Sequence, residues 1–431
     1  MRSQTVSLKL DQLRAQARQH PQRVFTTLHH LVDTNFLREA YRLTRKDAAT
    51  GADGVTAEEY AEHLERNLES LHERFKEGRY VAPFVRRVWI DKEDGSQRPI
   101  GIPAFEDKIL QRAISMILSA IYEVDFYDFS YGFREKRSPH DAIKSVRDGC
   151  YEAKVCTVID ADVSKFFDDM PHDRIREILR LRINDGKIIQ LIGKWLNAGV
   201  VEGGNISYPS CGSPQGGVIS PLIANIFLHH VLDEWFVDVV QPKLKGRSFL
   251  VRFADDFILG CEVDIDARKV MRVLSKRFDR YGLSIHPDKS KMVHFRWPSR
   301  FSRKSRTGTF DFLGFTHFWG RSRSGHWVVK RQTMRKRQAR AMRVIYLYCQ
   351  SNKHEPLRDQ LKGLRVKLIG LYNYYGIRCN YRSLWMIYQY TRECWRKWLS
   401  RRSNTGVISW KKFEQFLKIW KLPEPIITKM V

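Results

Sequence analysis

Two adjacent carboxylates interrupt an apolar segment of this chain. Residues 251–260 read VRFADDFILG, in which Asp255 and Asp256 stand inside a run of apolar residues. Short apolar runs of this kind are typical of buried strands, whose side chains alternate between the two faces. Because a buried carboxylate without a partner is very costly, the pattern predicts a hairpin whose turn presents both groups. A divalent metal ion would explain their presence, and a solvated Asp-Asp turn is the simpler alternative.

The basic residues are concentrated near the C-terminus. Residues 321–431 contain 26 Lys and Arg against 5 Asp and Glu, which gives +21 of a formal net charge of +27 and leaves +6 for the other 320 residues. This excess is more than solubility requires, and it indicates a polyanionic partner. Tyrosines and tryptophans are interleaved with the charges, which favours a groove that follows phosphates and stacks bases. A helical core would also use these aromatic side chains, and we expect it to take about half of them.

Cysteine usage and hydropathy restrict the compartment. The seven cysteines are scattered and include no CxxC pair, which argues against a zinc finger and favours the reduced thiols of a cytosolic protein. The first 20 residues lack the apolar core of a signal peptide, and no uncharged apolar stretch approaches the length of a membrane span. We therefore expect a cytoplasmic protein with no membrane partner. The lack of a Ser/Arg-rich leader favours a bacterial host, where the protein could associate with the nucleoid.

Strands and helices alternate along most of the chain. The first 80 residues are mostly helical, and residues 84–103 predict a hairpin with a turn at Asp94-Gly95. From about Cys150, a strand, a helix, a hairpin, a helix and a strand follow one another, which is typical of an α+β unit. From Gln332 onwards the pattern is helical.

A third carboxylate joins the first two if the strands pair. Asp162 ends the β-rich run KVCTVIDADV, and pairing of this strand with the hairpin would bring Asp162, Asp255 and Asp256 to one spot. Such an oxygen-rich site suits two Mg²⁺ ions, which about 4 Å apart can stabilise both oxygens of an in-line phosphoryl displacement. Asp160 is a competing candidate, which we expect to point to the opposite face.

Six segments in order resemble the reverse transcriptase blocks of group II intron-encoded proteins. They read RPIGIPAFEDKILQRAI, DADVSKFFDDM, GSPQGGVISPLIANIFLHHVLDEW, VRFADDFILG, GLSIHPDKSKM and FDFLGF. The basic segments LKGLRVKLIGLYNYYGI and LWMIYQYTRECWRKWLSRRS resemble the maturase thumb of the same proteins. The resemblance covers nearly the whole chain.

The resemblance implies an α+β fold of the right-hand polymerase type. Fingers and palm would combine an antiparallel sheet with helices, and an all-α basic thumb would follow. We place an N-terminal extension and the fingers at residues 1–150, the palm at 151–325 and the helical thumb or maturase domain at 326–431. Residues 171–205 could return to the fingers.

The resemblance also assigns roles to single residues. It makes Asp162, Asp255 and Asp256 the catalytic carboxylates that bind two Mg²⁺ ions, with Mn²⁺ as a substitute. Phe167 matches the steric gate beneath the sugar of the incoming dNTP, where a bulky ring excludes a 2′-hydroxyl; a plain core phenylalanine is the alternative. Gln215 matches a residue of the nucleotide pocket, in a loop whose glycines let the backbone approach the ligand, and would otherwise be a turn residue.

Further assignments concern the triphosphate and the primer. Lys92 and Arg98 flank the turn of the fingers hairpin at the spacing that places both on the triphosphate, for which a point charge and a planar fork are suited. Lys289 matches a lysine near the leaving pyrophosphate, and an exposed strand-end lysine is the equal alternative. Leu313 and Gly314 match the primer grip, where backbone approaches the primer end.

These matches predict an RNA-directed DNA polymerase that also assists the splicing of its intron as a maturase. Its partners would be an RNA template, the intron RNA, a DNA or RNA primer and dNTPs; the oligomeric state is unknown. Two features depart from the family. Phe253 stands where the family usually has Tyr, and no Cys/His-bearing endonuclease domain follows the thumb. An alternative is therefore a domesticated relative that acts in phage defence, DNA repair or CRISPR spacer acquisition.

Overall fold

The structure is a computed structural model that describes residues 2–91, 95, 97–212, 216–299, 307–402 and 406–429. The helices are α1 (Arg2–Gln19), η1 (His29–Leu31), α2 (Thr34–Leu43), α3 (Ala57–Glu62), α4 (Leu64–Lys76), α5 (Phe105–Asp125), α6 (Pro139–Glu152), α7 (Phe166–Asp169), α8 (His172–Arg180), α9 (Gly186–Leu196), α10 (Ser220–Leu228), η2 (His229–Val240), η3 (Gln241–Lys243), α11 (Asp264–Arg280), α12 (Arg335–Ser351), α13 (Leu357–Tyr375), α14 (Tyr381–Ser400) and α15 (Trp410–Ile419). The strands are β1 (Val85–Asp91), β2 (Gln97–Ile102), β3 (Thr157–Ala161), β4 (Val200–Glu202), β5 (Asn205–Ser207), β6 (Ser248–Phe253), β7 (Asp256–Cys261), β8 (Lys291–His294), β9 (Phe310–Phe312), β10 (Phe315–Arg321) and β11 (Trp327–Thr333).

The N-terminal helices pack around α5, which is buried along most of its length. Helix α3 begins with a capping box, because Thr56 Oγ1 accepts a hydrogen bond from the backbone N–H of Glu59 while Glu59 Oε2 accepts one from the backbone N–H of Thr56. This region also carries a sheet of order β2-β1-β4-β5. Strands β1 and β2 form the predicted hairpin, and β1 pairs in parallel with β4.

A second sheet, of order β6-β7-β3-β8, is antiparallel throughout and lies between helices. Its side chains alternate between two hydrophobic cores, as a strand requires. One face packs with residues of α11 and the other with residues of α6. The first core receives Ile159, Leu250, Phe257 and Leu259, and the second receives Val158, Val251 and Ile258. Burying each such side chain contributes about 1.5–3 kcal/mol, so the centre of this sheet is firmly held.

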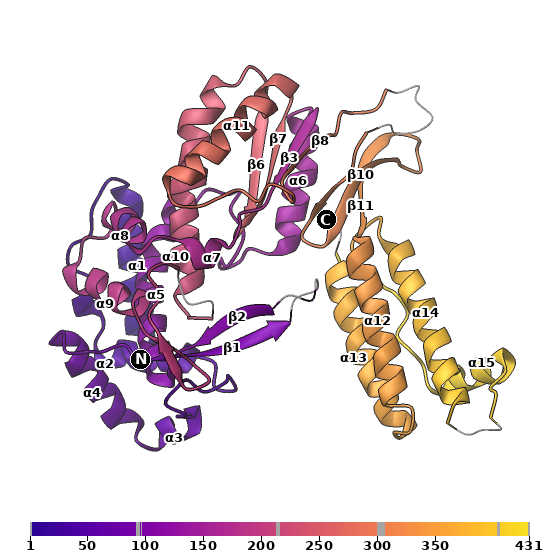
Figure 1. Ribbon diagram of the computed structural model, residues 1–431, viewed down its shortest axis with the longest axis horizontal. Coiled ribbons are helices and arrows are strands. Elements are labelled where there is room, and N and C mark those ends of the chain that lie inside the picture. Colours follow the sequence, from indigo (N-terminus) through magenta and orange to yellow (C-terminus); the bar gives the residue numbers. More distant parts are fainter. Residues whose placement is uncertain are drawn as a thin grey trace.

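The C-terminal region is built from long helices with their own core. Helices α12, α13 and α14 enclose a cluster that includes Trp395 and Phe413 and is separate from the cores of the body. Figure 1 shows this bundle to one side of the molecule, below the β10–β11 hairpin. The predicted boundary at residue 326 falls in the turn of that hairpin, so β11 lies within the region expected to be all helical. Strand β11 buries every second residue, Arg331 included.

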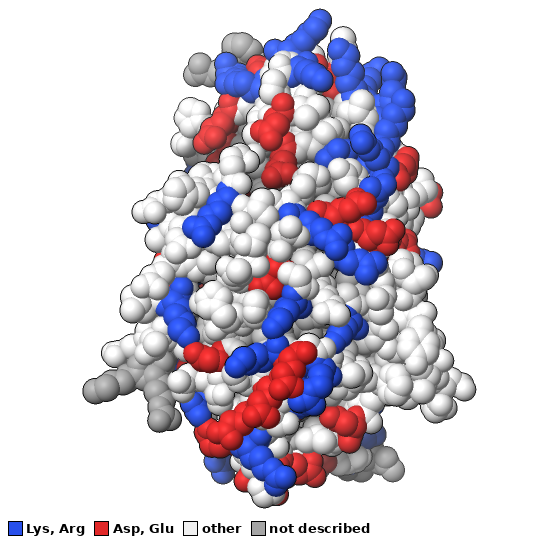
Figure 2. All heavy atoms as spheres, turned by 90° about the vertical axis from the view of Figure 1, so that its left-hand side faces the viewer, with Lys and Arg blue, Asp and Glu red and all other residues white. Residues whose placement is uncertain are grey.

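The fold class is confirmed as α+β, with mostly antiparallel sheets. The division into fingers, palm and thumb at the predicted boundaries stays a prediction. Figure 2, which views the molecule from the left-hand side of Figure 1, shows Lys and Arg intermixed with Asp and Glu on that face. Among the described residues, no helix is both long and apolar enough to cross a membrane. The seven cysteines, all described, are free thiols.

Candidate active site

The predicted hairpin around the paired carboxylates is present. Strands β6 and β7 pair antiparallel, and the last pair of the register joins Phe253 and Asp256, which leaves Ala254 and Asp255 as the turn. Ala254 has a φ of 57°, a left-handed conformation that is uncommon for a residue with a Cβ. Phe253, at the position where the family usually has Tyr, packs partly buried against the core on the α6 side.

The third carboxylate lies opposite this hairpin. Strand β3 pairs antiparallel with β7, with Asp160 opposite Ile258 and Ala161 opposite Phe257. One further step of the same register places Asp162 opposite Asp256. Residues opposite each other in an antiparallel pair have Cβ atoms about 4.5–5.5 Å apart. The pairing of β3 with the hairpin, which the sequence predicted, therefore brings Asp162 and Asp256 together at one end of the sheet.

Asp160 lies on the same side as Asp162, so the expectation that it points away is wrong. The two residues are two positions apart, and residues two apart share one face of a strand. Both line a cavity of about 460 Å³ together with Asp256. Lys291 Nζ lies 3.5 Å from Asp160 Oδ2, on the neighbouring strand β8.

The carboxylates of this cluster repel one another. Desolvation by the surrounding protein raises the pKa of Asp256 to about 7, and the charges of Asp255, Asp162 and Asp160 add to the effect. Desolvation also raises the pKa of Asp255, with Asp162 acting in the same direction and Arg98 against it. The Asp256 side chain is open to the cavity, so solvent screens part of this repulsion.

A divalent cation fits the chemistry of this cluster. In the ranges described, no group of three or more His, Cys, Asp or Glu side chains is arranged so that it could hold a metal ion. Carboxylate oxygens are nevertheless the ligands that Mg²⁺ prefers, and a cation would relieve the repulsion that adds to desolvation in raising the pKa of Asp256. In the structure a protein cation partly fills this role, because Lys289 Nζ lies 3.3 Å from Asp162 Oδ2.

The predicted primer-grip residues face the same cavity. Leu313 and Gly314 form the turn between β9 and β10, with φ angles of 48° and 81°. The Tyr374 hydroxyl donates to the Leu313 carbonyl at 2.9 Å, and the backbone N–H of Met334 donates to the Gly314 carbonyl at 3.0 Å. A Cβ at Gly314 would lie 2.9 Å from the Tyr375 hydroxyl. The turn is thus held by residues that follow it in the chain, namely Met334, Tyr374 and Tyr375.

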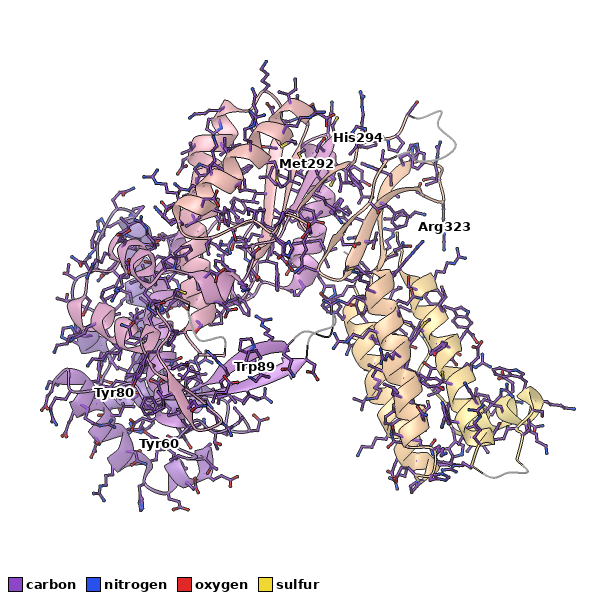
Figure 3. All side chains as sticks on the ribbon, in the orientation of Figure 1. Tyr60, Tyr80, Trp89, Met292, His294 and Arg323 are labelled. Atoms are coloured by element: carbon purple, nitrogen blue, oxygen red, sulfur yellow. The ribbon has the colours of Figure 1, made fainter. Side chains whose placement is uncertain are left out.

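The residues predicted to bind the nucleotide from the β1–β2 hairpin and from the loop at Gln215 are only partly described. Arg98 lies on β2, exposed, and its charge lowers the pKa of Asp255, so its guanidinium acts on the carboxylate site. Lys92, like Asp94 of the predicted turn, lies outside the described residues, and so does Gln215. Figure 3 marks Trp89 on the same hairpin, where its indole Nε1 donates to Glu202 Oε1 at 2.5 Å.

The two adjacent phenylalanines differ in their surroundings. Phe166 is buried and contacts the ring of Phe227 in the core. Phe167 is also buried, but it lines a second cavity of about 420 Å³ with Gly101 of β2 and with Gly212. Phe167 thus faces the sheet that contains β2, and it is not among the residues that line the carboxylate cavity.

The structure adds cavity residues that the sequence did not single out. Asp311, Arg337, Tyr374 and Tyr375 line the carboxylate cavity. Desolvation and then Tyr375 raise the pKa of Tyr374 to about 12, and the charge of Asp256 adds to this rise. Asp311 stands two residues before Leu313, so the primer-grip match could have found it. For Tyr374 and Tyr375 the sequence offered only a general indication of a binding role, because they are aromatic residues in a basic segment.

Comparison with known proteins decides the family. The model of the family described as "Reverse transcriptase (RNA-dependent DNA polymerase)" matches residues 90–317, which contain all of the sheet β6-β7-β3-β8 and the β9–β10 turn. The chain belongs to the reverse transcriptase family. The predicted enzyme class, an RNA-directed DNA polymerase, is thereby confirmed. Members of the family use divalent metal ions and bind an RNA template.

Curated relatives of this reverse transcriptase include intron-encoded proteins. Protein YkfC of Escherichia coli is 33% identical over 340 residues, which cover 70% of this chain and 85% of YkfC. Group II intron-encoded protein LtrA of Lactococcus lactis is 34% identical over 238 residues, which cover 55% of this chain but 39% of LtrA. Nuclear intron maturase 1 of Arabidopsis thaliana is 31% identical over 108 residues, 25% of this chain and 14% of the relative. The predicted resemblance to group II intron-encoded proteins is confirmed.

Proposed function

We propose that this reverse transcriptase extends a primer 3′-hydroxyl on an RNA template by two-metal-ion nucleotidyl transfer, and that it serves a group II intron as a maturase. The primer 3′-oxygen attacks the α-phosphorus of a dNTP, a new P–O bond forms, pyrophosphate leaves and the hydroxyl proton passes to solvent. The observation that carries the proposal is the register that sets Asp162 opposite Asp256, beside Asp255.

Each protein group has a distinct task in this proposal. Asp162, Asp255 and Asp256 would hold two Mg²⁺ ions. When bound, these ions would stabilise the negative charge on the attacking and leaving oxygens. Arg98 and Lys289 provide positive charge for the triphosphate and the leaving pyrophosphate. In the same way Lys92 is proposed to act on the triphosphate from the other side of the fingers turn.

The sugar and the primer are positioned by other groups. Phe167 is proposed to exclude ribonucleotides by its ring, and its place at the cavity between fingers and palm supports this. Gln215 is proposed to line the nucleotide pocket. Leu313 and Gly314 offer backbone to the primer end, which supports a primer grip because their turn and Asp162 line one cavity.

A primer-extension assay tests the polymerase proposal. Purified protein given poly(rA)/oligo(dT), dTTP and Mg²⁺ should make DNA, and Asp255→Asn should lower the rate by about 10³-fold, because the metal-ion contribution is several kcal/mol. Asp279→Asn, an exposed aspartate on α11, is the matched control and should retain the wild-type rate. A folded wild type that is inactive with every RNA-templated primer would overturn the proposal.

The intron partner is supported by the basic thumb and by the relatives named as intron-encoded proteins. RNA transcribed from the DNA that flanks the gene should self-splice faster when the protein is added. Binding of this RNA should weaken with salt, with a log-log slope of about −0.7 per phosphate contact. A flanking sequence that yields no spliced product with or without protein would contradict the maturase role.

We further propose a bacterial cytoplasmic setting. The support is the presence of Escherichia coli and Lactococcus lactis proteins among the relatives and the free state of the cysteines. Fractionation of the native host should recover the protein with the cytoplasm or the nucleoid, and recovery in the membrane fraction would contradict it.

A further inference from the structure

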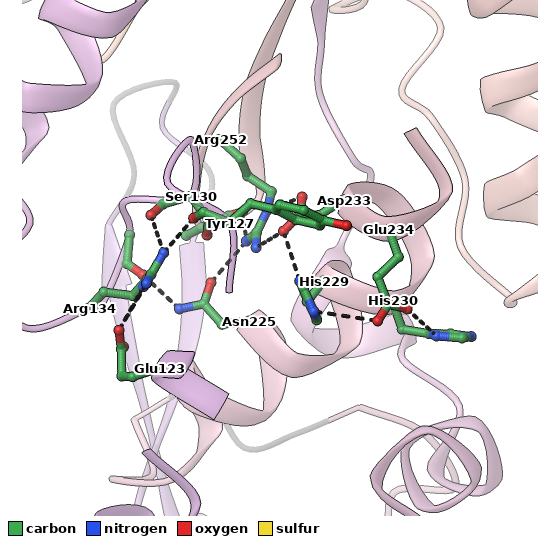
Figure 4. Close-up of polar contacts among 12 residues, drawn as sticks. Glu123, Tyr127, Ser130, Arg134, Asn225, His229, His230, Asp233, Glu234 and Arg252 are labelled. Atoms are coloured by element: carbon green, nitrogen blue, oxygen red, sulfur yellow. Dashed lines mark hydrogen bonds and ion pairs between the residues drawn. The ribbon is translucent and has the colours of Figure 1, made fainter. Parts of the chain in front are cut away.

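An arginine lies fully buried directly before the catalytic turn. Arg252 is on β6, three residues before Asp255, and its side chain is 0% exposed. It forms a two-pronged ion pair with Asp233 of η2, from Nε to Oδ1 at 2.8 Å and from Nη2 to Oδ2 at 2.5 Å. The Asp233 side chain is also 0% exposed. Figure 4 shows this pair at the centre of a network of polar contacts.

The third prong of the guanidinium reaches the turn itself. Arg252 Nη1 donates to the Ala254 carbonyl at 3.1 Å and to Asn225 Oδ1 at 2.9 Å. The Asn225 amide in turn donates to the Gly132 carbonyl at 2.6 Å. The side chains of Arg252, Asp233 and Asn225, here called the turn anchor, thus connect two helices and a loop to the hairpin.

The loop at Gly132 presses against the same turn. A Cβ at Gly132 would lie 2.2 Å from the backbone nitrogen of Ala254, so no larger residue fits there without movement. The preceding segment also pairs with β6, because the N–H of Arg252 donates to the Phe129 carbonyl and the N–H of Tyr131 to the Arg252 carbonyl, both at 2.9 Å. Ala254 keeps its left-handed φ of 57° within this frame. Strained backbone of this kind persists only where the surroundings determine it.

Stability alone does not account for the buried pair. Removing two charges from water costs several kcal/mol each, and replacing a buried pair with apolar residues of similar volume is often neutral or stabilising. If the ion pair only stabilised the fold, its replacement by a well-packed apolar pair would leave the polymerase activity unchanged. If the ion pair orients the turn, the same replacement would lower the activity.

We propose that Arg252, Asp233 and Asn225 are positioning residues, which fix the Ala254 carbonyl and thereby orient the carboxylates of Asp255 and Asp256 toward the metal ions that they would hold. The inference rests on the proposed polymerase function and deepens it. The physical reason is that a displacement of about 1 Å of a reacting group can cost about 10²-fold in rate. The turn anchor acts through the turn and does not touch the substrate.

The first experiment replaces the ion pair with an apolar pair. Arg252→Met combined with Asp233→Leu retains the buried volume without buried charge, so the melting temperature should fall only by what the lost hydrogen bonds from Arg252 to Ala254 and Asn225 cost. We expect kcat on poly(rA)/oligo(dT) to fall by about 10²-fold while KM for dTTP and the affinity for primer–template change less than threefold. The electron paramagnetic resonance signal of free Mn²⁺ should show weaker Mn²⁺ binding by the variant–primer–template complex, with no dNTP present.

The matched control is the other strongly buried Arg–Asp pair described here, Arg182–Asp125, with side chains 8% and 19% exposed. Arg182 also donates to backbone carbonyls near the end of α1, so Arg182→Met with Asp125→Leu should lower the melting temperature. Its kcat and Mn²⁺ binding, measured below that temperature, should match those of the wild type. A folded Arg252→Met/Asp233→Leu protein with wild-type kcat and Mn²⁺ binding would overturn the proposal.

A milder variant covers the case in which the double variant does not fold. Asn225→Ala keeps the ion pair but removes the link to Gly132, and we expect kcat to fall about tenfold, as each 1.4 kcal/mol is a factor of ten. Wild-type kcat in this variant would also overturn the proposal. If the wild type makes no DNA, the polymerase function fails by itself, and the comparison of Mn²⁺ binding still decides whether the turn anchor aims the carboxylates.

Discussion

Two hairpins carry some of the charged residues assigned to the reaction, and they are built in opposite ways. The β6–β7 hairpin is buried on both faces, between residues of α6 and α11, and the turn anchor holds its tip. The β1–β2 hairpin is buried at Val85 and exposed toward its tip, where Trp89 and Ile90 are 44% and 55% exposed. In the proposed reaction, the carboxylates that must hold fixed positions lie at the tip of an embedded hairpin, and Arg98, which would meet the triphosphate, lies on an exposed one.

The contrast has an electrostatic side. Carboxylates held close together repel, and the register of β3 with β7 keeps Asp162 and Asp256 side by side, so the β6–β7 tip carries unfavourable charge that a cation would relieve. Arg98 on β2 is exposed and opposes this charge from a distance. The comparison therefore predicts that substitutions at the first tip affect the chemical step and that substitutions at the second affect substrate binding.

The largest effect is expected at Asp256. Asp256→Asn should lower kcat by about 10³-fold and leave primer–template affinity nearly unchanged, because it removes a ligand for the metal ions and not a contact to nucleic acid. Single-turnover extension of labelled oligo(dT) measures both. A fall in kcat of less than tenfold would mean that the buried hairpin is not the metal-binding tip.

The packing behind the turn should come next. Gly132→Ala places a Cβ 2.2 Å from Ala254 N, which should lower the free energy of unfolding by about 1–3 kcal/mol and kcat by about tenfold. Gly370→Ala, in α13 with nothing within 4 Å of the new Cβ, should instead stabilise the protein by about 0.5–1 kcal/mol. Urea unfolding and primer extension of the two variants check this. If both variants had the same free energy of unfolding and the same kcat, close packing of Gly132 against Ala254 would not support the turn.

A smaller effect, of a different kind, is expected on the exposed hairpin. Arg98→Ala should raise KM for dTTP about tenfold with kcat changed less than threefold, because a hydrogen bond to a charged group is worth about 1.5–3 kcal/mol. Arg98→Lys should recover part of the loss, since it keeps the charge but not the planar fork. Steady-state kinetics at fixed primer–template decides the matter. A kcat loss as large as that of Asp256→Asn would erase the distinction between the two hairpins.

The smallest effect concerns stability and pH without metal ions. The pKa of Asp256 is about 7 in the folded chain against an ordinary value of 3.8, so the folded protein holds this proton more tightly. Stability should therefore rise as the pH falls from 7.5 towards 4, and Asp256→Asn should lose this part of the rise. The readout is the difference in urea midpoints of the two proteins in EDTA across that range. A difference that does not change with pH would show that neither desolvation nor the neighbouring carboxylates raise the pKa of Asp256 in the folded state.

Much of the fold could be predicted from local pattern. Alternating apolar residues predicted the two hairpins and the strand before Asp162, and helical spacing predicted the long C-terminal helices. These predictions hold because strand and helix periodicity is set by the backbone. Strand β11 was not predicted, because its buried positions include Arg331, a residue type that rarely faces a core, and because it ends at Thr333, inside the segment from Gln332 that we expected to be helical.

The sequence by itself determined which residues are chemically able to act: the three aspartates, the basic hairpin residues and the glycine-bearing turn at Leu313. It also determined the family, because the motifs occur in a fixed order. Only the tertiary structure decided that Arg337 lines the same cavity as Asp162, that the Tyr374 hydroxyl donates to the Leu313 carbonyl, and that Arg252 donates to the Ala254 carbonyl. The reason is physical, since these relations join residues that are distant in the chain or depend on strand register, and register is fixed by packing of both sheet faces rather than by local preference.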